Sequence, residues 1–140
     1  MMVWVHAAVG ALVGAHAKTP SGAVAGGIVS HLACDLVPHK DYSLAVEAPL
    51  ALAMFLYLAK RYGIYSPQTL GALGAVLPDA ENALAVLGIV PAAATLFPTH
   101  NDTRPWFVGH GRKVQSPLPQ VALALAALAL ASRPNQEHSG

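Results

Sequence analysis

Long apolar runs separated by short polar segments predict an all-α protein. We expect helices over residues 3–17, 20–37, 44–61, from 66 onward, 80–97 and 118–132. Pro20 and the pair Ser66-Pro67 stand at helix starts, where proline and a capping serine are favoured. Pro38 should end the second helix near Val37, because the residue before a proline avoids the α conformation.

Two arrangements are open for the segment from Leu77 to Asn82, which reads LPDAEN. Pro78 either kinks one long helix or separates two helices. Pro91 should bend the helix that follows. If the chain forms one kinked helix here, His100 lies on the same side of the bundle as the other candidate site residues.

The first two helices are predicted to form an antiparallel hairpin centred near Thr19. His6 lies 13 residues before Thr19 and His31 lies 12 after it, so helices rising about 1.5 Å per residue bring both to nearly the same depth. Small residues at i+4 steps line one ridge of each helix: Gly10 and Gly14, and Ala23 and Gly27. We expect these ridges to face each other and the two histidines to share a site.

Composition changes the expected environment of this bundle. Hydrophobic residues make up 54% of the 140-residue chain and charged residues 11%, whereas soluble domains carry about 25% charged residues. This predicts an all-α integral membrane bundle of about five or six short helices in a bacterial or archaeal inner membrane. One helical domain is expected over residues 1–133, with a disordered tail over 134–140. The net charge of +1 argues against nucleic acid as a partner, and a homo-oligomer is compatible with the pattern.

The segment from Ser30 to Asp41, SHLACDLVPHKD, has the spacing of a metal site. His31, Asp35 and His39 stand four residues apart, and residues at i and i+4 of a helix have Cβ atoms about 5–6 Å apart. Zn–N and Zn–O bonds are about 2.0–2.2 Å long, so an imidazole and a carboxylate at this spacing can bind one ion. His39, in the turn after the helix, can fold back over the helix end. The alternative is that these polar residues form hydrogen bonds across a helix interface.

Other polar residues are candidates for the same site. Asp79 lies between two apolar stretches, where an acid is a candidate for function, although it also suits the first turn of a helix. Asp79 or Glu81 is the candidate base that orients a water molecule. His100 and His110 belong to the polar segment 97–119 and are weaker candidates. Cys34 is expected to be a small core residue.

These motifs resemble those of small bacterial membrane-bound metal-dependent hydrolases, and more distantly those of zinc-dependent phospholipase C and single-strand nucleases. The resemblance lies in the His-x-x-x-Asp pair, Pro-His-Lys-Asp at 38–41 and Leu-Pro-Asp at 77–79. In the membrane hydrolases the Leu-Pro-Asp motif precedes the histidine-rich helices, whereas here it follows them. The resemblance implies that about one to three zinc-like ions are bound by a shared set of ligands: His6, His31, Asp35, His39 and Asp79.

The resemblance also implies metal-assisted hydrolysis of a phosphoester, which in a membrane is a lipid or lipid-linked substrate. Arg104, Arg112 or Lys113 is a candidate for attracting the phosphate. Two other classes of function are open. A metal or proton transporter would spread its histidines and acids along the membrane depth. A noncatalytic membrane scaffold would use them to hold helices together and would bind no metal.

Overall fold

The computed structural model describes residues 1–132, and this part of the chain is all-α, as predicted. Residues 1–132 form five α-helices and one 3-10 helix: α1 (Val3–Ala15), α2 (Pro20–Leu36), α3 (Leu44–Tyr62), α4 (Pro67–Val86), η1 (Ala92–Ala94) and α5 (Leu118–Ala131). The predicted tail over residues 134–140 lies outside the described residues.

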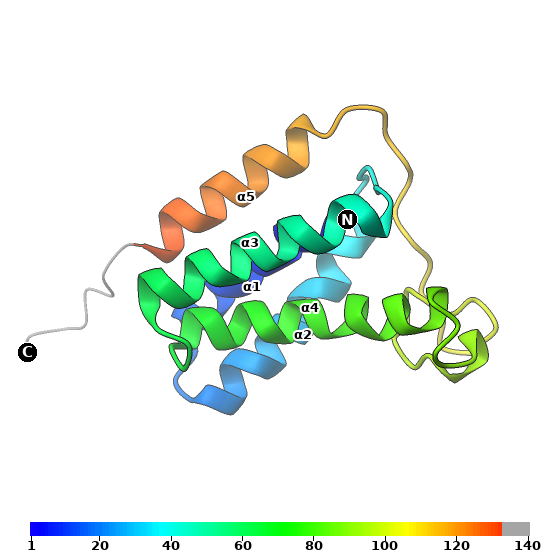
Figure 1. Ribbon diagram of the computed structural model, residues 1–140, viewed down its shortest axis with the longest axis horizontal. Coiled ribbons are helices and arrows are strands. Elements are labelled where there is room, and N and C mark those ends of the chain that lie inside the picture. The colour runs from blue at the N-terminus through cyan, green and yellow to red at the C-terminus, as the bar shows by residue number, and fades with distance from the viewer. Residues whose placement is uncertain (133–140) are drawn as a thin grey trace, which may run out of the picture.

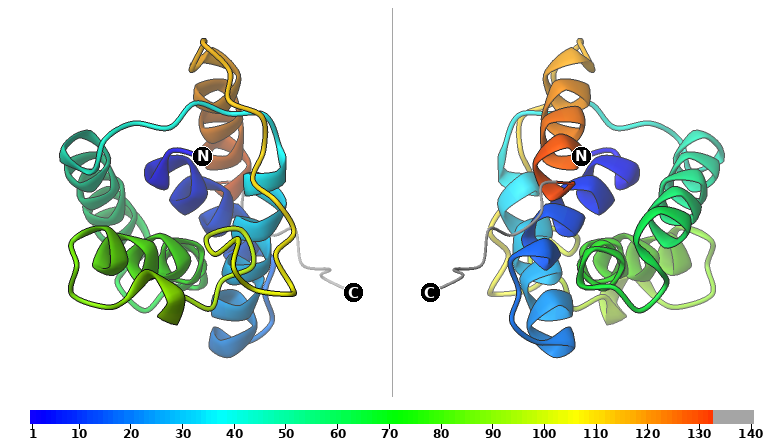
Figure 2. Two further views of the ribbon diagram at one scale, coloured as in Figure 1. Left: turned by 90° about the vertical axis from the view of Figure 1, so that its right-hand side faces the viewer. Right: turned by 90° about the vertical axis from the view of Figure 1, so that its left-hand side faces the viewer.

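The helix α1 lies at the centre of the bundle. Figure 2 shows the other four α-helices arranged around it, and α1 packs against each of them. A short turn then returns α2 toward the end of the bundle where α1 begins, so the predicted N-terminal hairpin is present (Figure 1). Thr19 caps α2, because its side-chain oxygen accepts a hydrogen bond of 3.0 Å from Gly22 N. Pro20 occupies the first turn of the same helix.

Glycines allow α4 to cross α1 and α2 at the distance of backbone contact. A Cβ atom added to Gly71 would collide with the carbonyl oxygen of Gly10, and one added to Gly27 would collide with that of Gly71. The sequence predicts that the glycine ridges of α1 and α2 face each other, but α4 packs into both of them. The reason is that α4 carries small residues of its own, Gly74 and Ala75, beside Gly71.

The helix α4 runs through Pro78 as a single helix of 20 residues, which is one of the two arrangements that the sequence left open. It ends at Val86, so the predicted helix over residues 80–97 is wrong beyond that point. Gly88 follows with a φ of 71°, a left-handed conformation that glycine adopts easily and that commonly ends helices. Ile89 N donates a hydrogen bond of 2.9 Å to Leu84 O and so satisfies one of the last carbonyl groups of the helix.

Within residues 1–132, no helix is both long enough and apolar enough to cross a membrane. The helices α1 and α5 have 13 and 14 residues, and at about 1.5 Å per residue neither matches the roughly 30 Å of a bilayer core. The helices α3 and α4 are longer, but they contain charged residues, including Glu47 in α3 and Asp79 in α4. The predicted membrane-spanning helices are therefore not found among the described residues.

Cys34 is a core residue, as predicted. It belongs to an apolar cluster that includes Val5, Ala8 and Ala124. Burial raises the pKa of its thiol to about 11, and metal ions bind the thiolate rather than the thiol. We therefore do not include Cys34 among the candidate ligands.

Replacing Gly71 by alanine should destabilise the bundle by about 1–3 kcal/mol, because the new methyl group forces α1 and α4 apart. The matched control is Gly22→Ala in α2, where the new Cβ meets only the Thr19 hydroxyl, 2.9 Å away. The capping hydroxyl must shift slightly to admit the methyl group, but alanine also favours the helix, so the loss at this exposed position should be much smaller than in Gly71→Ala. Thermal denaturation followed by circular dichroism measures both effects, and equal losses in the two variants would contradict the packing described above.

Candidate metal centre

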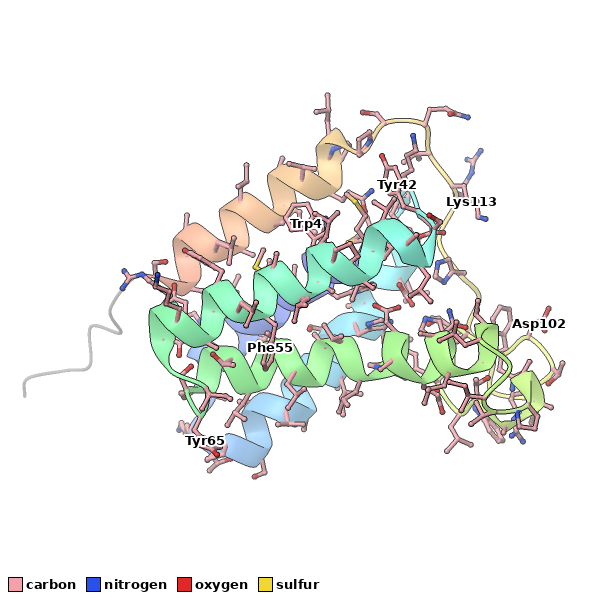
Figure 3. The ribbon with its side chains drawn as sticks, in the orientation of Figure 1. Trp4, Tyr42, Phe55, Tyr65, Asp102 and Lys113 are labelled. Atoms are coloured by element: carbon pink, nitrogen blue, oxygen red, sulfur yellow. The ribbon has the colours of Figure 1, made fainter. Side chains whose placement is uncertain are left out.

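All of the predicted ligands come together at one end of the bundle, on the right in Figure 1. Tyr42, Asp102 and Lys113 mark this end in Figure 3. The start of α1, the end of α2, the second half of α4 and two loop segments contribute side chains. The set includes His100 and His110, the two candidate histidines that the sequence favoured least. The other members are the ligands that the resemblance implied: His6, His31, Asp35, His39 and Asp79.

Asp35 lies at the centre of the cluster, and its side chain is only 1% exposed. Its Oδ2 atom lies 3.1 Å from Nε2 of His31 and 3.3 Å from Nε2 of His100. Ligand atoms around a tetrahedral zinc ion are about 3.4 Å apart when the bonds are about 2.0–2.1 Å long. The three side chains are therefore spaced as ligands of one ion.

Backbone carbonyl groups fix the tautomers of three histidines in the cluster. Nδ1 of His31 lies 2.7 Å from Ala75 O, Nδ1 of His39 lies 2.6 Å from Val37 O, and Nδ1 of His100 lies 3.2 Å from Pro78 O. A carbonyl oxygen can only accept a hydrogen bond, so each Nδ1 must carry the proton. In its neutral form, each of these rings therefore has its lone pair on Nε2, which is the atom that faces the carboxylates.

The Asp35 carboxyl is held in its ionised form. Met1 N donates a hydrogen bond of 3.2 Å to its Oδ1 atom and the Thr99 hydroxyl donates one of 2.6 Å to its Oδ2 atom, and both contacts stabilise the charged form. A lone pair on His31 Nε2 and a carboxylate oxygen 3.1 Å away repel each other unless a proton or a metal ion lies between them. Neutral imidazoles and an ionised carboxylate are the donor set that a divalent ion requires.

His6 completes one wall of the cluster, as its sequence position predicted. Its ring stacks on the ring of His31, with centroids 3.8 Å apart and an interplanar angle of 16°. Burial lowers the pKa of His6 to about 3, so the ring is neutral at physiological pH. Among the described residues, neither of its ring nitrogens has a hydrogen-bond partner of suitable geometry, although Nε2 lies 3.1 Å from Asp35 Oδ1. Buried polar atoms are rarely left unpaired, so His6 is a further candidate ligand.

A second group of ligands lies beside the first. Nε2 of His39 lies 2.8 Å from Nε2 of His110 and 3.0 Å from Asp41 Oδ1. His39 is buried because the chain folds back after α2, as the sequence predicted. Together with Asp35, His39 and His110 form a further set whose ligand atoms lie within 4.8 Å of one another. Asp35 therefore belongs to two candidate metal positions.

Residues 109–114, which we call the strap, bring His110 to this second group. The strap runs alongside the end of α2, where Gly111 N donates a hydrogen bond of 2.7 Å to Asp35 O and His39 N donates one of 3.1 Å to Arg112 O. A Cβ atom on Gly111 would lie 2.8 Å from Asp35 O and would collide with Val37 O. Only glycine permits this approach.

The two candidate bases lie in different environments. Burial raises the pKa of Asp79 to about 6, and within residues 1–132 its buried Oδ2 atom has no hydrogen-bond partner. Glu81, in contrast, accepts hydrogen bonds from the backbone N–H groups of Leu96 and Phe97, at 2.8 and 3.1 Å. The structure thus places Asp79 at the cluster, whereas Glu81 anchors the loop that precedes His100.

One residue in the centre was missed by the sequence interpretation. Thr99 is buried, and its hydroxyl donates a hydrogen bond of 2.6 Å to Asp35 Oδ2. The only signal in the sequence is its position next to His100.

Arg104, a candidate for binding phosphate, instead donates to Ala93 O at 2.7 Å, and its guanidinium lies over the ring of Trp106.

Comparisons of this chain with protein-family models, with curated proteins and with solved structures gave no match. The candidacy of this cluster as a metal centre therefore depends on its donor atoms and their spacing.

The variant Gly111→Ala should bind about one zinc ion fewer per chain than the wild-type protein, because the methyl group displaces the strap and removes His110 from the second ligand set. The ion near His31 should remain. Elemental analysis of the purified variants measures this, with Gly22→Ala at the other end of α2 as control. Unchanged zinc content in Gly111→Ala would show that the strap does not position a ligand.

Proposed function

We propose that the protein is a metal-dependent hydrolase that holds two zinc-like ions at this end of the bundle. The observation that carries the proposal is the set of three histidines whose Nδ1–H groups are held by backbone carbonyls. Hydrogen bonds of this kind orient metal-binding imidazoles and increase their basicity. A structural polar network would give the buried Nε2 of His31 a hydrogen-bond partner, and within residues 1–132 it has none.

Each proposed ion has its own ligands. His31, Asp35 and His100 would bind the first, and Asp35, His39 and His110 the second, with Asp35 between them. A third possible set combines His6 and Asp79 with His31. It uses a ligand of the first set, so the first and third sets compete and two ions fit the donor atoms best.

A divalent ion bound here would supply a Lewis acid and a water molecule of lowered pKa. We assign the role of base to Asp79, which lies at the edge of the cluster with 17% of its side chain exposed. A carboxyl group with a pKa of about 6 is ionised at neutral pH and still basic enough to accept a proton from water. Glu81 is not assigned this role, since both of its oxygens accept hydrogen bonds from backbone N–H groups.

The adjoining cavity supports a substrate with a polar and an apolar part. Its volume is about 480 Å³. Asp79, His100 and His110 line it on the side of the cluster, and Leu44 and Val86 are among its apolar residues. We therefore propose a phosphoester substrate that carries an apolar group, as a lipid-linked phosphate does.

The position of the ligands supports hydrolysis over the other two classes. A transporter needs polar residues along a path, whereas these gather at one end of the bundle. A scaffold needs a satisfied network, yet in the described part of the chain both ring nitrogens of His6 and Nε2 of His31 are buried without a hydrogen-bond partner.

Membrane location and contact with lipid stay predictions. Their support is that large apolar side chains are exposed on several helices, for example Leu56 of α3, Val86 of α4 and Leu125 of α5. Surfaces of this kind contact lipid or another protein. A homo-oligomer stays a prediction for the same reason.

Metal analysis tests the proposed centre. Protein purified without chelators should contain zinc-like ions, and His31→Ala and Asp35→Ala should each lose most of them while keeping their helix content. His16→Ala is the matched control, because His16 is a histidine exposed at the other end of the bundle. If the wild-type protein contains no stoichiometric metal and added Zn²⁺ does not raise its melting temperature, the scaffold function replaces the hydrolase.

Hydrolysis tests the role of Asp79. Asp79→Asn should lower the rate on an aryl phosphodiester by about 100-fold or more, since an amide cannot accept the proton. Glu81→Gln should retain most of the rate, because Glu81 is assigned no chemical role. The two variants are compared at equal metal content. A rate that falls equally in both variants would contradict the assignment.

A further inference from the structure

Thr99 makes the shortest polar contact of the central carboxylate. Its hydroxyl lies 2.6 Å from Asp35 Oδ2, a length typical of a hydroxyl that donates to an ionised carboxylate. Both side chains are almost fully buried. The residues are 64 positions apart in the sequence, so this contact links the loop after α4 to the end of α2.

The contact determines which lone pairs of Asp35 are free. A carboxylate oxygen has two lone pairs, and the Thr99 hydroxyl occupies one of them on Oδ2. The other remains available on the atom that lies 3.1 Å from His31 Nε2 and 3.3 Å from His100 Nε2. Oδ2 can then bind a single ion, in the set that these two histidines complete.

We propose that Thr99 is the positioning residue of the metal centre. It holds the Asp35 carboxylate so that one lone pair of Oδ2 points to the ion bound by His31 and His100. This inference rests on the proposed metal centre, and it adds a residue that binds no ion itself. Without the hydroxyl, Oδ2 loses its donor, and Met1 N, which donates to Oδ1 at 3.2 Å, is left to hold the carboxylate.

The loop that carries Thr99 is built to hold this position. The Asn101 amide donates hydrogen bonds to the carbonyl groups of Ala92 and Thr95, at 3.3 and 2.9 Å. Glu81 accepts from the N–H group of Phe97 at 3.1 Å. None of these contacts involves the Thr99 side chain, so removing its hydroxyl should leave the loop in place.

Three variants separate positioning from loop stability. Thr99→Val has nearly the same shape and lacks the hydroxyl, whereas Thr99→Ser keeps it. Thr95→Val is the matched control: Thr95 is in the same loop, is 2% exposed, and donates its hydroxyl to Ala92 O at 2.9 Å, away from the ligands. Titration of metal-free protein with Co²⁺ gives the affinity, and the visible absorption of bound Co²⁺ reports its coordination.

We expect Thr99→Val to bind Co²⁺ about 10- to 100-fold more weakly, with altered visible bands. Thr99→Ser and Thr95→Val should keep both the affinity and the spectrum of the wild-type protein. Wild-type affinity and spectrum in Thr99→Val would overturn the inference and leave the metal centre standing. An equal loss in Thr95→Val would also overturn it, because the effect would then come from the loop. A wild-type protein that binds no Co²⁺ would overturn both the inference and the proposed function.

Discussion

The candidate metal centre depends on the close approach of α4 to α1 and α2 at their glycines. This approach brings the backbone of α4 within hydrogen-bond distance of the histidines, so that Ala75 O accepts from His31 and Pro78 O from His100. A side chain at Gly71 would push α4 away from α1, and the two carbonyl groups would move with it. Helix packing and imidazole orientation are therefore set by the same contact, which is why the ligands of these helices lie on the same i+4 ridges as the small residues.

The parts of the site that lie on one helix could be predicted from the sequence. His31 and Asp35 are one turn apart on α2, and their spacing alone places them together. His6 follows from counting residues across the turn at Thr19, because a hairpin fixes the depth of both helices. The position of His39 follows from Pro38, which ends the helix and turns the chain back over it.

The parts contributed by the loops could not be predicted in this way. His100, Thr99 and His110 reach the centre through hydrogen bonds between segments far apart in the sequence, such as those that Thr99 and Gly111 donate to Asp35. No periodic pattern marks such contacts.

The end of α4 was also missed, since apolar residues continue past Val86 although Gly88 ends the helix. The high apolar content predicted membrane-spanning helices, but the apolar residues are divided among helices too short or too polar to cross a membrane.

The distance in sequence between ligands makes a bound ion a reversible cross-link. His39 and His110 are 71 residues apart, and a permanent bond closing a loop of about 70 residues restricts an unfolded chain by about 4 kcal/mol. Residues 87–117 form little regular structure and carry two of the histidines. An ion would therefore fasten this long segment to α2 much as a disulfide does. The order of the segment would then follow the supply of metal in the surroundings, so that a shortage of metal would first loosen about a fifth of the chain.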